Sequence, residues 1–376
     1  INGLNFDLLL ASYLVDSSIK SSIEVVMNIY GIDLRDDSDQ MSLFSQSNAK
    51  KTTKVAYFVK ALEEKALNEL NKISATELYK TLELPLASTL AEMEIEGFPL
   101  DPKVLDSFGD VYKEKCKDLE QEIYEMAGEK FNVASPKQIG EILFNKLGLK
   151  GNKKMSTSVD VLKELKDEHP IVPKILEYRK YFKLVSTYVE GLKVHIHNDG
   201  KIHAKFNQAL TATGRLSSSE PNLQNISVRD EEGKLIRKAF YYPNDEYSIL
   251  SLDYSQIELR VLSSLSNCKA LKDIFNSGED IHSATAKKIF NLTDEPTSAQ
   301  RRRAKTVNFG IVYGISSYGL SEDLSISKKE AQEYIEQYFK TYPDIKVFLD
   351  RMVSDAKENG YSTTLFGRRR PIPELS

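Results

Sequence analysis

Four residues in one short segment have the types and the spacing to bind a phosphate chain and a flat ring. The segment RRRAKTVNFGIVYG spans residues 301–314. In a helix, where a step of four residues drifts by only about 40°, one stripe would hold Arg301, Lys305, Phe309 and Tyr313. The basic pair can grip a polyphosphate, and the rings offer flat faces to a sugar or a base. The alternative is a helix with a solvated basic end and a buried aromatic end, and periodicity leaves both open.

A second segment, SLDYSQIELR at residues 251–260, places a carboxylate where an apolar strand is expected to enter a helix. Asp253 at a strand end could bind Mg²⁺, which takes one or two carboxylates together with phosphate oxygens. On spacing alone the plainer interpretation of Asp253 is a helix N-cap, and Glu258 can be a solvated helix residue.

A third segment, FNQALTATGRLSSSEPNLQNI at residues 206–226, is rich in Asn, Gln, Ser and Thr and carries Arg215 after Gly214. Such side chains can donate hydrogen bonds to the phosphates and groove edges of a duplex. Taken alone, the segment is also typical of a polar surface loop.

The length and composition of the chain limit the class of protein that can contain these segments. The chain has 376 residues, of which 41% are hydrophobic and 28% charged, enough for two or three domains with their own cores. It contains no apolar run of about 18 residues and no signal peptide, so we expect no membrane contact. Cys116 and Cys268 are too few for a disulfide framework or a zinc cluster, which indicates a reducing cytoplasm. The net charge of -4 excludes a uniformly basic surface but allows a local basic cleft.

The elements that must position these side chains predict an α+β fold, with a sheet region between helical arms. Apolar spacing predicts a helix over 55–70, after mixed structure, and another that ends at Gly97. Strands are expected within 193–250, with a hairpin at Asn198-Asp199-Gly200 and a short strand before Asp253. Further helices are expected over 102–127, 158–192, 298–314, 327–340 and 343–359.

The three segments, in this order and at these spacings, closely resemble the family A DNA polymerases of the bacterial DNA polymerase I type. DYSQIELR is similar to motif A of that family, RRRAKTVNFGIVYG to motif B, and TATGRLSSSEPNLQNI to the segment before motif A. The resemblance runs from about residue 80 to the end, through LASTLAEMEIEGFPLD, NVASPKQIGEILFNKLGL, LVSTYVEGL, GEDIHSATA and GYSTTLFGRRRPIPEL.

The resemblance implies a right-hand polymerase, with a palm sheet and helical thumb and fingers, preceded by part of a degenerate exonuclease-like domain. The implied parts are an inactive 3′–5′ exonuclease-like remnant at 1–78, palm entry at 79–95, thumb at 96–192, palm with motif A at 193–260, and incomplete fingers with motif B at 261–376. We expect a monomer that begins, at Ile1, as a piece of a longer product.

The implied activity is template-directed DNA synthesis, in which dNTPs are joined to the 3′-hydroxyl of a primer with two Mg²⁺ ions. Asp253 and the carbonyl of Tyr254 would hold metal, and Asp253 with Arg301 and Lys305 forms the expected catalytic set. The resemblance implies that Arg301 and Lys305 bind the triphosphate and that His282 contacts a nearby phosphate. Phe309 is expected under the sugar, and Tyr313 at the template position. Glu258 is expected to be a steric gate against ribose, and Gln256 is a further expected nucleotide contact. Contacts to primer–template DNA are expected from Lys183, Arg215, Gln224 and Asn225.

The sequence departs from the family pattern in two places. No His-Asp-Glu tripeptide, which would bring the second catalytic aspartate, occurs in it, and the reversed Asp167-Glu168-His169 is expected to lie in solvent. We therefore expect this chain alone to be inactive. The exonuclease pattern also fails, because Ala61 stands four residues after Tyr57 where the family has an acid, so we expect no 3′–5′ exonuclease.

Two other functions stay open. A single-subunit RNA polymerase shares the logic of both motifs, although Glu258 as a gate and Phe309 in place of a hydroxylated ring argue against it. A non-catalytic nucleic-acid binding fragment would bind DNA with a salt-sensitive affinity and without coupling to nucleotide.

Overall fold

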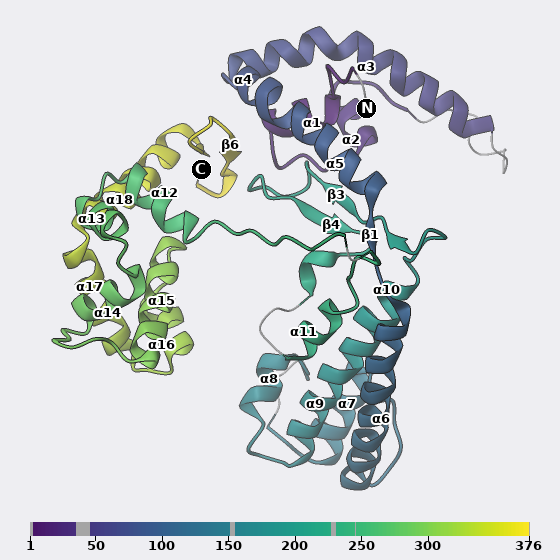
Figure 1. Cartoon of the computed structure of the whole chain (residues 1–376), viewed down its shortest axis with the longest axis vertical. Coiled ribbons are helices and arrows are strands. Elements are labelled where there is room, and N and C mark those ends of the chain that lie inside the picture. Colours follow the sequence, from purple (N-terminus) through teal and green to yellow (C-terminus); the bar gives the residue numbers. More distant parts are fainter. Residues whose placement is uncertain (1–2, 35–45, 151–154, 227–230, 245, 376) are drawn as a thin grey trace. The chain divides into compact units, whose positions relative to one another are not determined.

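The computed structural model describes residues 3–34, 46–150, 155–226, 231–244 and 246–375 (Figure 1). The chain forms two compact units. Unit 1 contains Ile1–Leu250 with Leu365–Arg368, and unit 2 contains Ser251–Thr364 with Arg369–Ser376. Both units are largely helical and the strands are short, as an α+β polymerase fold predicts. No helix in the described ranges is both long and apolar enough to cross a membrane.

Unit 1 begins with a helical layer. Its elements are α1 (Leu8–Val15), α2 (Ile23–Ile29), α3 (Gln46–Lys72), α4 (Thr76–Leu78), the π-helix η1 (Tyr79–Glu83) and α5 (Leu84–Glu96). Leu14, Met27 and Leu70 are buried between them. The helix expected over 55–70 is confirmed as part of α3, but the mixed structure expected before it is wrong for the described residues, which hold helices and no strand. Gly97 ends α5 at φ +63°, as expected of a glycine stop.

A bundle of long helices forms the other end of unit 1. It contains α6 (Pro102–Ala127), α7 (Pro136–Gly140), the π-helix η2 (Glu141–Lys146), α8 (Val159–Glu164), α9 (Ile171–Lys183), the π-helix η3 (Leu184–Glu190), α10 (Gly191–Lys193) and α11 (Glu231–Arg237). In Figure 1, α6 and α9 run side by side, and Leu105, Ile123 and Ile175 are buried in this bundle. The single helix expected over 158–192 is interrupted before α9, at Pro170, because proline lacks an N–H and disfavours helix in the residue before it.

In the ranges that the structure describes, the β-structure consists of three two-stranded antiparallel ribbons. They pair β1 (Phe98–Pro99) with β2 (Lys201–Ile202), β3 (Lys205–Asn207) with β4 (Ser217–Ser219), and β5 (Tyr361–Thr363) with β6 (Arg369–Pro371). The chain does turn at Asn198-Asp199-Gly200, where the His197 amide donates to the Lys201 carbonyl at 2.9 Å and Ile196 bridges Ile202. The expected hairpin is therefore reduced to one bridge, because β2 pairs with β1 from a distant part of the chain. The described residues also form two short 3₁₀ helices, η4 (Leu223–Asn225) and η5 (Pro373–Leu375).

Unit 2 is a helical layer around its own core. Its helices are α12 (Ile257–Leu265), α13 (Lys269–Ser277), α14 (Ile281–Ile289), α15 (Ser298–Val312), α16 (Ser317–Leu324), α17 (Lys328–Thr341) and α18 (Pro343–Asn359). Tyr338 and Tyr342 are fully buried in this core. The three helices expected from the sequence here are confirmed as α15, α17 and α18, with ends within two residues of the expected ones.

The strand expected before Asp253 is wrong. Residues 248–254 have no regular secondary structure, and the side chains of Leu250 and Leu252 are 78% and 83% exposed. The apolar pattern of this segment suits a sheet, but a strand exists only where a second segment pairs with its backbone. Within the described ranges no segment pairs with it.

A buried ion pair ties residues 365–368 into unit 1. The Glu83 side chain is 1% exposed and pairs with Arg368, whose guanidinium also lies 5.6 Å from the centre of the Tyr13 ring. Gln208 Nε2 donates to the Glu83 carbonyl at 2.9 Å and to the Glu83 carboxylate. Because breaking a buried pair leaves a charge without its partner, this cluster should matter more to stability than the exposed pairs do.

We expect Arg368→Ala to lower the free energy of unfolding by about 3 kcal/mol, because it leaves the Glu83 carboxylate buried without its cation. Lys346→Ala, which removes an exposed pair with Asp350, should cost less than about 1 kcal/mol. Urea titration followed by circular dichroism measures both. Equal losses would contradict the argument, and adding Glu83→Gln to Arg368→Ala should recover part of the loss.

Candidate active site

The stripe on α15 faces outward. Thr297 and Gln300 form a reciprocal capping box that starts the helix, and the opposite face buries Ala304, Val307, Asn308 and Ile311 in the core of unit 2. Arg301 and Lys305 are exposed, Phe309 is half-buried, and Tyr313 at the C-cap is 64% exposed. The aromatic end of this helix is therefore not fully buried. The segment can present two cations and two rings on one accessible face.

The Arg301 guanidinium is held by an acid from α14. Its Nε and Nη2 atoms donate to the two Asp280 carboxylate oxygens at 2.9 and 2.8 Å. Asp280 is also the N-cap of α14, where its Oδ2 accepts from the Ser283 amide at 2.8 Å. The hydrogen-bonded arginine holds the pKa of Asp280 at about 2, and the aspartate raises the pKa of Arg301 above its ordinary value.

His282 lies behind the stripe in a buried chain of polar groups. The ring is 3% exposed, its centre is 5.8 Å from that of Phe309, and its Nδ1 accepts from Asn308 Nδ2 at 3.0 Å. Thr285 Oγ1 donates to Asn308 Oδ1 at 3.3 Å and lies 3.1 Å from the Tyr342 hydroxyl. Burial lowers the pKa of His282, and the nearby Arg301 and Lys305 charges act in the same direction against Asp280. Burial therefore favours the neutral ring, and the Asn308 amide as a donor to Nδ1 favours the tautomer with its proton on Nε2.

The residues of motif A are placed at the start of α12. Gln256, at φ +53°, is the N-cap residue, so the interpretation of Asp253 as an N-cap is wrong. Glu258 in the first turn accepts a hydrogen bond from the Tyr313 hydroxyl at 2.6 Å, which joins α12 to the end of α15. Asp253 and Tyr254 are exposed.

A carboxylate and a carbonyl are the hard donors that Mg²⁺ prefers, so Asp253 and Tyr254 fit such an ion in kind. In the ranges that the structure describes, no group of three His, Cys, Asp or Glu side chains could hold a metal. The described residues thus offer one acidic ligand at the expected position.

The residues expected to contact DNA lie in unit 1, on its surface. Arg215, Gln224 and Asn225 are exposed on the loop around β4 and η4, and Lys183 is exposed at the end of α9. The loop is internally braced, since Thr211 Oγ1 donates to the Arg215 carbonyl at 2.7 Å and Gln224 Nε2 donates to the Leu216 carbonyl at 3.3 Å. The residues expected to bind nucleotide all lie in unit 2.

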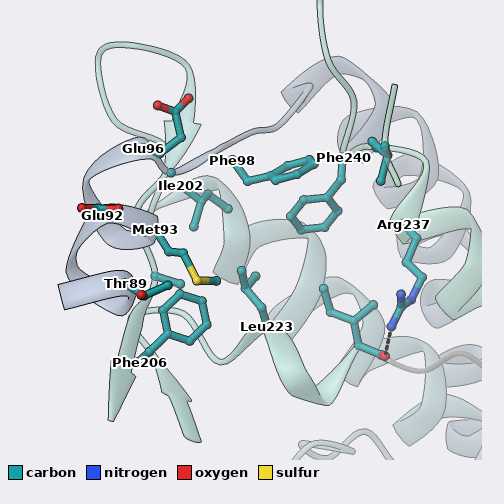
Figure 2. A pocket seen from close by; sticks show the side chains of 14 residues that line it. Thr89, Glu92, Met93, Glu96, Phe98, Ile202, Phe206, Leu223, Arg237 and Phe240 are labelled. Atoms are coloured by element: carbon teal, nitrogen blue, oxygen red, sulfur yellow. Dashed lines mark hydrogen bonds between the residues drawn. The ribbon is translucent and has the colours of Figure 1, made fainter. Parts of the chain in front are cut away.

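An apolar hollow of about 680 Å³ in unit 1 contains none of the predicted site residues. Figure 2 shows Phe98, Phe206 and Phe240 around it, with Arg237 at its rim donating to the Ile226 carbonyl at 3.2 Å. A hollow with this lining suits apolar contacts, and the charged groups of the stripe lie elsewhere, on α15.

Two residues of the site escaped the sequence patterns. Asp280 had a local signal, because an aspartate directly before the first residue of a helical apolar pattern is typical of an N-cap. No local sequence signal indicates that Asp280 pairs with Arg301 or that Asn308 pairs with His282, because each pair joins two different helices.

Residues 102–376 match the model of the family described as DNA polymerase family A. The chain belongs to this family. The DNA polymerase I of Bacillus subtilis (strain 168) is 45% identical over 391 residues, which cover 100% of this chain and 44% of the relative. That of Geobacillus stearothermophilus is 45% identical over 391 residues, with 100% and 45% covered. This family A chain thus spans less than half the length of these relatives.

A solved structure agrees with the family. The POL domain of Pol1 from M. smegmatis, in complex with DNA primer-template and dNTP, matches with a TM-score of 0.87 and 37% identity, over 98% of this chain and 65% of that one. The predicted family and the polymerase fold class are therefore confirmed. The division into thumb, palm and fingers and the roles of single residues stay predictions.

The buried position of His282 predicts a pH dependence of stability. Its folded pKa is lowered, so the unfolded chain takes up a proton first as the pH falls through about 6.5, and folding becomes less favourable. We expect His282→Gln to reduce the loss of stability between about pH 7.5 and pH 5. Urea midpoints at the two pH values measure it.

His203 provides a control of opposite sign. Hydrogen bonds to the Glu94 carbonyl and the Asp199 carboxylate raise its pKa, so its contribution is present below about pH 6.5 and is lost as the pH rises. His203→Gln should therefore destabilise more at low pH than at high pH. The same trend in both variants would contradict the assignment for His282.

Proposed function

We propose that this chain forms the catalytic part of a template-directed DNA polymerase, which transfers deoxynucleotides from dNTPs to a primer 3′-hydroxyl. The observation that carries the proposal is the outward stripe on α15, where Arg301 and Lys305 lie exposed in a member of DNA polymerase family A. Primer–template DNA and dNTP as partners are supported by the complex in which the M. smegmatis relative was solved.

Along the stripe two cations are followed by two aromatic rings, which matches the succession of triphosphate, sugar and base in a nucleotide. Arginine makes directed, paired hydrogen bonds to phosphate oxygens and lysine supplies a compact charge, so the first two turns of α15 bind the triphosphate. Phe309 supports the sugar, and Tyr313 stacks at the template position. Fixed cations at the places where negative charge develops stabilise the transition state of phosphoryl transfer.

Asp253, with the carbonyl of Tyr254, would hold metal. Two Mg²⁺ ions, when bound, activate the primer hydroxyl and neutralise charge on the triphosphate. Asp253 supplies one carboxylate, and we propose that the second comes from polypeptide outside residues 1–376. On this proposal the 376-residue chain alone does not extend primers.

Glu258 acts as the steric gate that excludes a ribose 2′-hydroxyl. Its hydrogen bond with the Tyr313 hydroxyl supports this role, because the bond fixes the carboxylate beside the aromatic end of the stripe. Lys183, Arg215, Gln224 and Asn225 contact the duplex, and the protein works as a monomer. Residues 1–78 carry no 3′–5′ exonuclease, and the exposed Tyr57 on α3 serves no metal site.

We expect Mg²⁺-dependent primer extension when the chain is joined at its carboxyl end to a family A segment with the His-Asp-Glu motif, and none from the chain alone. In the joined protein, Lys305→Ala should lower kcat/KM for dNTP about 10²- to 10³-fold, because it removes a cation from the triphosphate. Arg303→Ala is the matched control, since Arg303 is exposed on the same helix but lies about 160° from Lys305.

Each outcome of that assay is decisive. Extension by the chain alone would overturn the need for a second segment, and no extension by the joined protein would overturn the polymerase proposal. DNA binding that responds to salt but not to dNTP and Mg²⁺ would favour a non-catalytic fragment.

The steric gate gives a separate prediction. In the joined protein, Glu258→Ala should raise the ratio of ribonucleotide to deoxynucleotide incorporation at least tenfold, because it opens room for the 2′-hydroxyl. Tyr313→Phe removes the hydrogen bond but leaves the carboxylate, and should change this ratio much less. A wild-type protein that already prefers ribonucleotides would indicate a single-subunit RNA polymerase.

A further inference from the structure

Asp280 has no role in the proposed reaction so far, yet it contacts the first cation of the stripe. Both of its carboxylate oxygens accept from Arg301, in the parallel arrangement that fixes a guanidinium most firmly. These bonds use Nε and Nη2. Among the described residues no acceptor is bonded to Nη1, so this edge of the guanidinium is available to another anion.

The backbone of α14 holds the carboxylate of Asp280 in place. As the N-cap of α14 it accepts from the Ser283 amide at 2.8 Å, and α14 packs against α15. The charge also lies at the positive end of the α14 dipole. The arginine is therefore attached to the core of unit 2 through a short, rigid acid, whereas a free arginine side chain samples many rotamers.

We propose that Asp280 is a positioning residue, which holds Arg301 so that its free edge and the Lys305 ammonium form a preformed site for the triphosphate of a nucleotide. The inference rests on the proposed function of the stripe and names a residue that acts through Arg301. Ordering a long side chain before the ligand arrives lowers the cost of binding, and for one such side chain the effect on affinity is about three- to tenfold.

Charge repulsion alone predicts the opposite effect of Asp280 on the affinity for a triphosphate. A carboxylate beside the site repels phosphate, so its neutralisation should strengthen anion binding if charge alone matters. Both groups are partly exposed, with side chains 45% and 33% accessible, and water and salt screen such a repulsion. We therefore expect orientation to outweigh repulsion, and the sign of one measured change separates the two effects.

The variant Asp280→Asn removes the negative charge of residue 280 and keeps its role as the N-cap of α14. Asparagine is as good an N-cap as aspartate and keeps an acceptor for the Ser283 amide, but it cannot make the paired, charged contact with Arg301. Binding of dATP and of inorganic tripolyphosphate to the 376-residue chain is measured by isothermal titration calorimetry. We expect the Kd of both to rise about three- to tenfold.

Two further variants control the experiment. Asp101→Asn neutralises the N-cap of α6, which accepts from the Lys103 amide at 2.8 Å, and should leave both Kd values unchanged. In an Arg301→Ala background, Asp280→Asn should cause no additional loss, because the residue through which it acts is gone. Melting temperatures of the two asparagine variants check that α14 in Asp280→Asn and α6 in Asp101→Asn are still capped.

Three results would overturn the inference. Tighter binding in Asp280→Asn would mean that the acid competes with phosphate, and an unchanged Kd would mean that it does not prepare the site. An equal loss in the Arg301→Ala background would mean that it acts through another group. The proposed function is judged separately, because tripolyphosphate binding needs neither DNA nor a second catalytic aspartate. A protein that extends primers but ignores Asp280→Asn loses this inference alone.

Discussion

The packing of α15 against α14 is the constraint on which the candidate site depends. Asn308 is buried, and among the described residues its side-chain amide is hydrogen-bonded to His282 and Thr285 of α14. A buried amide without partners is costly, so a rotation of α15 by one residue would be penalised strongly. Because the period of a helix is fixed, Arg301 lies two turns before Asn308 on the same side of α15, so holding Asn308 against α14 also brings Arg301 beside Asp280. A polar contact in the core thereby sets the direction of a charged surface.

The position of the charged residues matters more in this chain than the net charge does. The net charge is -4, yet the face of α15 carries Arg301 and Lys305 in the open. Asp280 pairs with the first of these without burying it. On the proposed function, such a site would favour a polyphosphate, whereas a diffuse basic surface would bind any polyanion.

Asp253 illustrates the opposite situation. The residues that resemble motif A lie partly in a segment without regular secondary structure and partly in α12, which starts directly after Gln256. Glu258, on the helix, has a defined partner in Tyr313, whereas Asp253 is exposed on backbone that pairs with no strand in the described ranges. A strand gains its rigidity from its neighbours, so the position of a catalytic carboxylate on such a segment depends on what pairs with it.

The sequence by itself determined three helices of unit 2, α15, α17 and α18, together with the stop at Gly97 and the family. Apolar spacing, caps and motifs depend on residues that are near one another in the chain. It also placed Arg301, Lys305, Phe309 and Tyr313 on one stripe. Only the tertiary structure decided that Tyr313 is exposed, that His282 is buried and that residues 248–254 form no strand. It alone revealed the pairs Asp280–Arg301 and Glu83–Arg368, whose members are 21 and 285 residues apart. Such contacts depend on which elements pack together, and no local pattern records that choice.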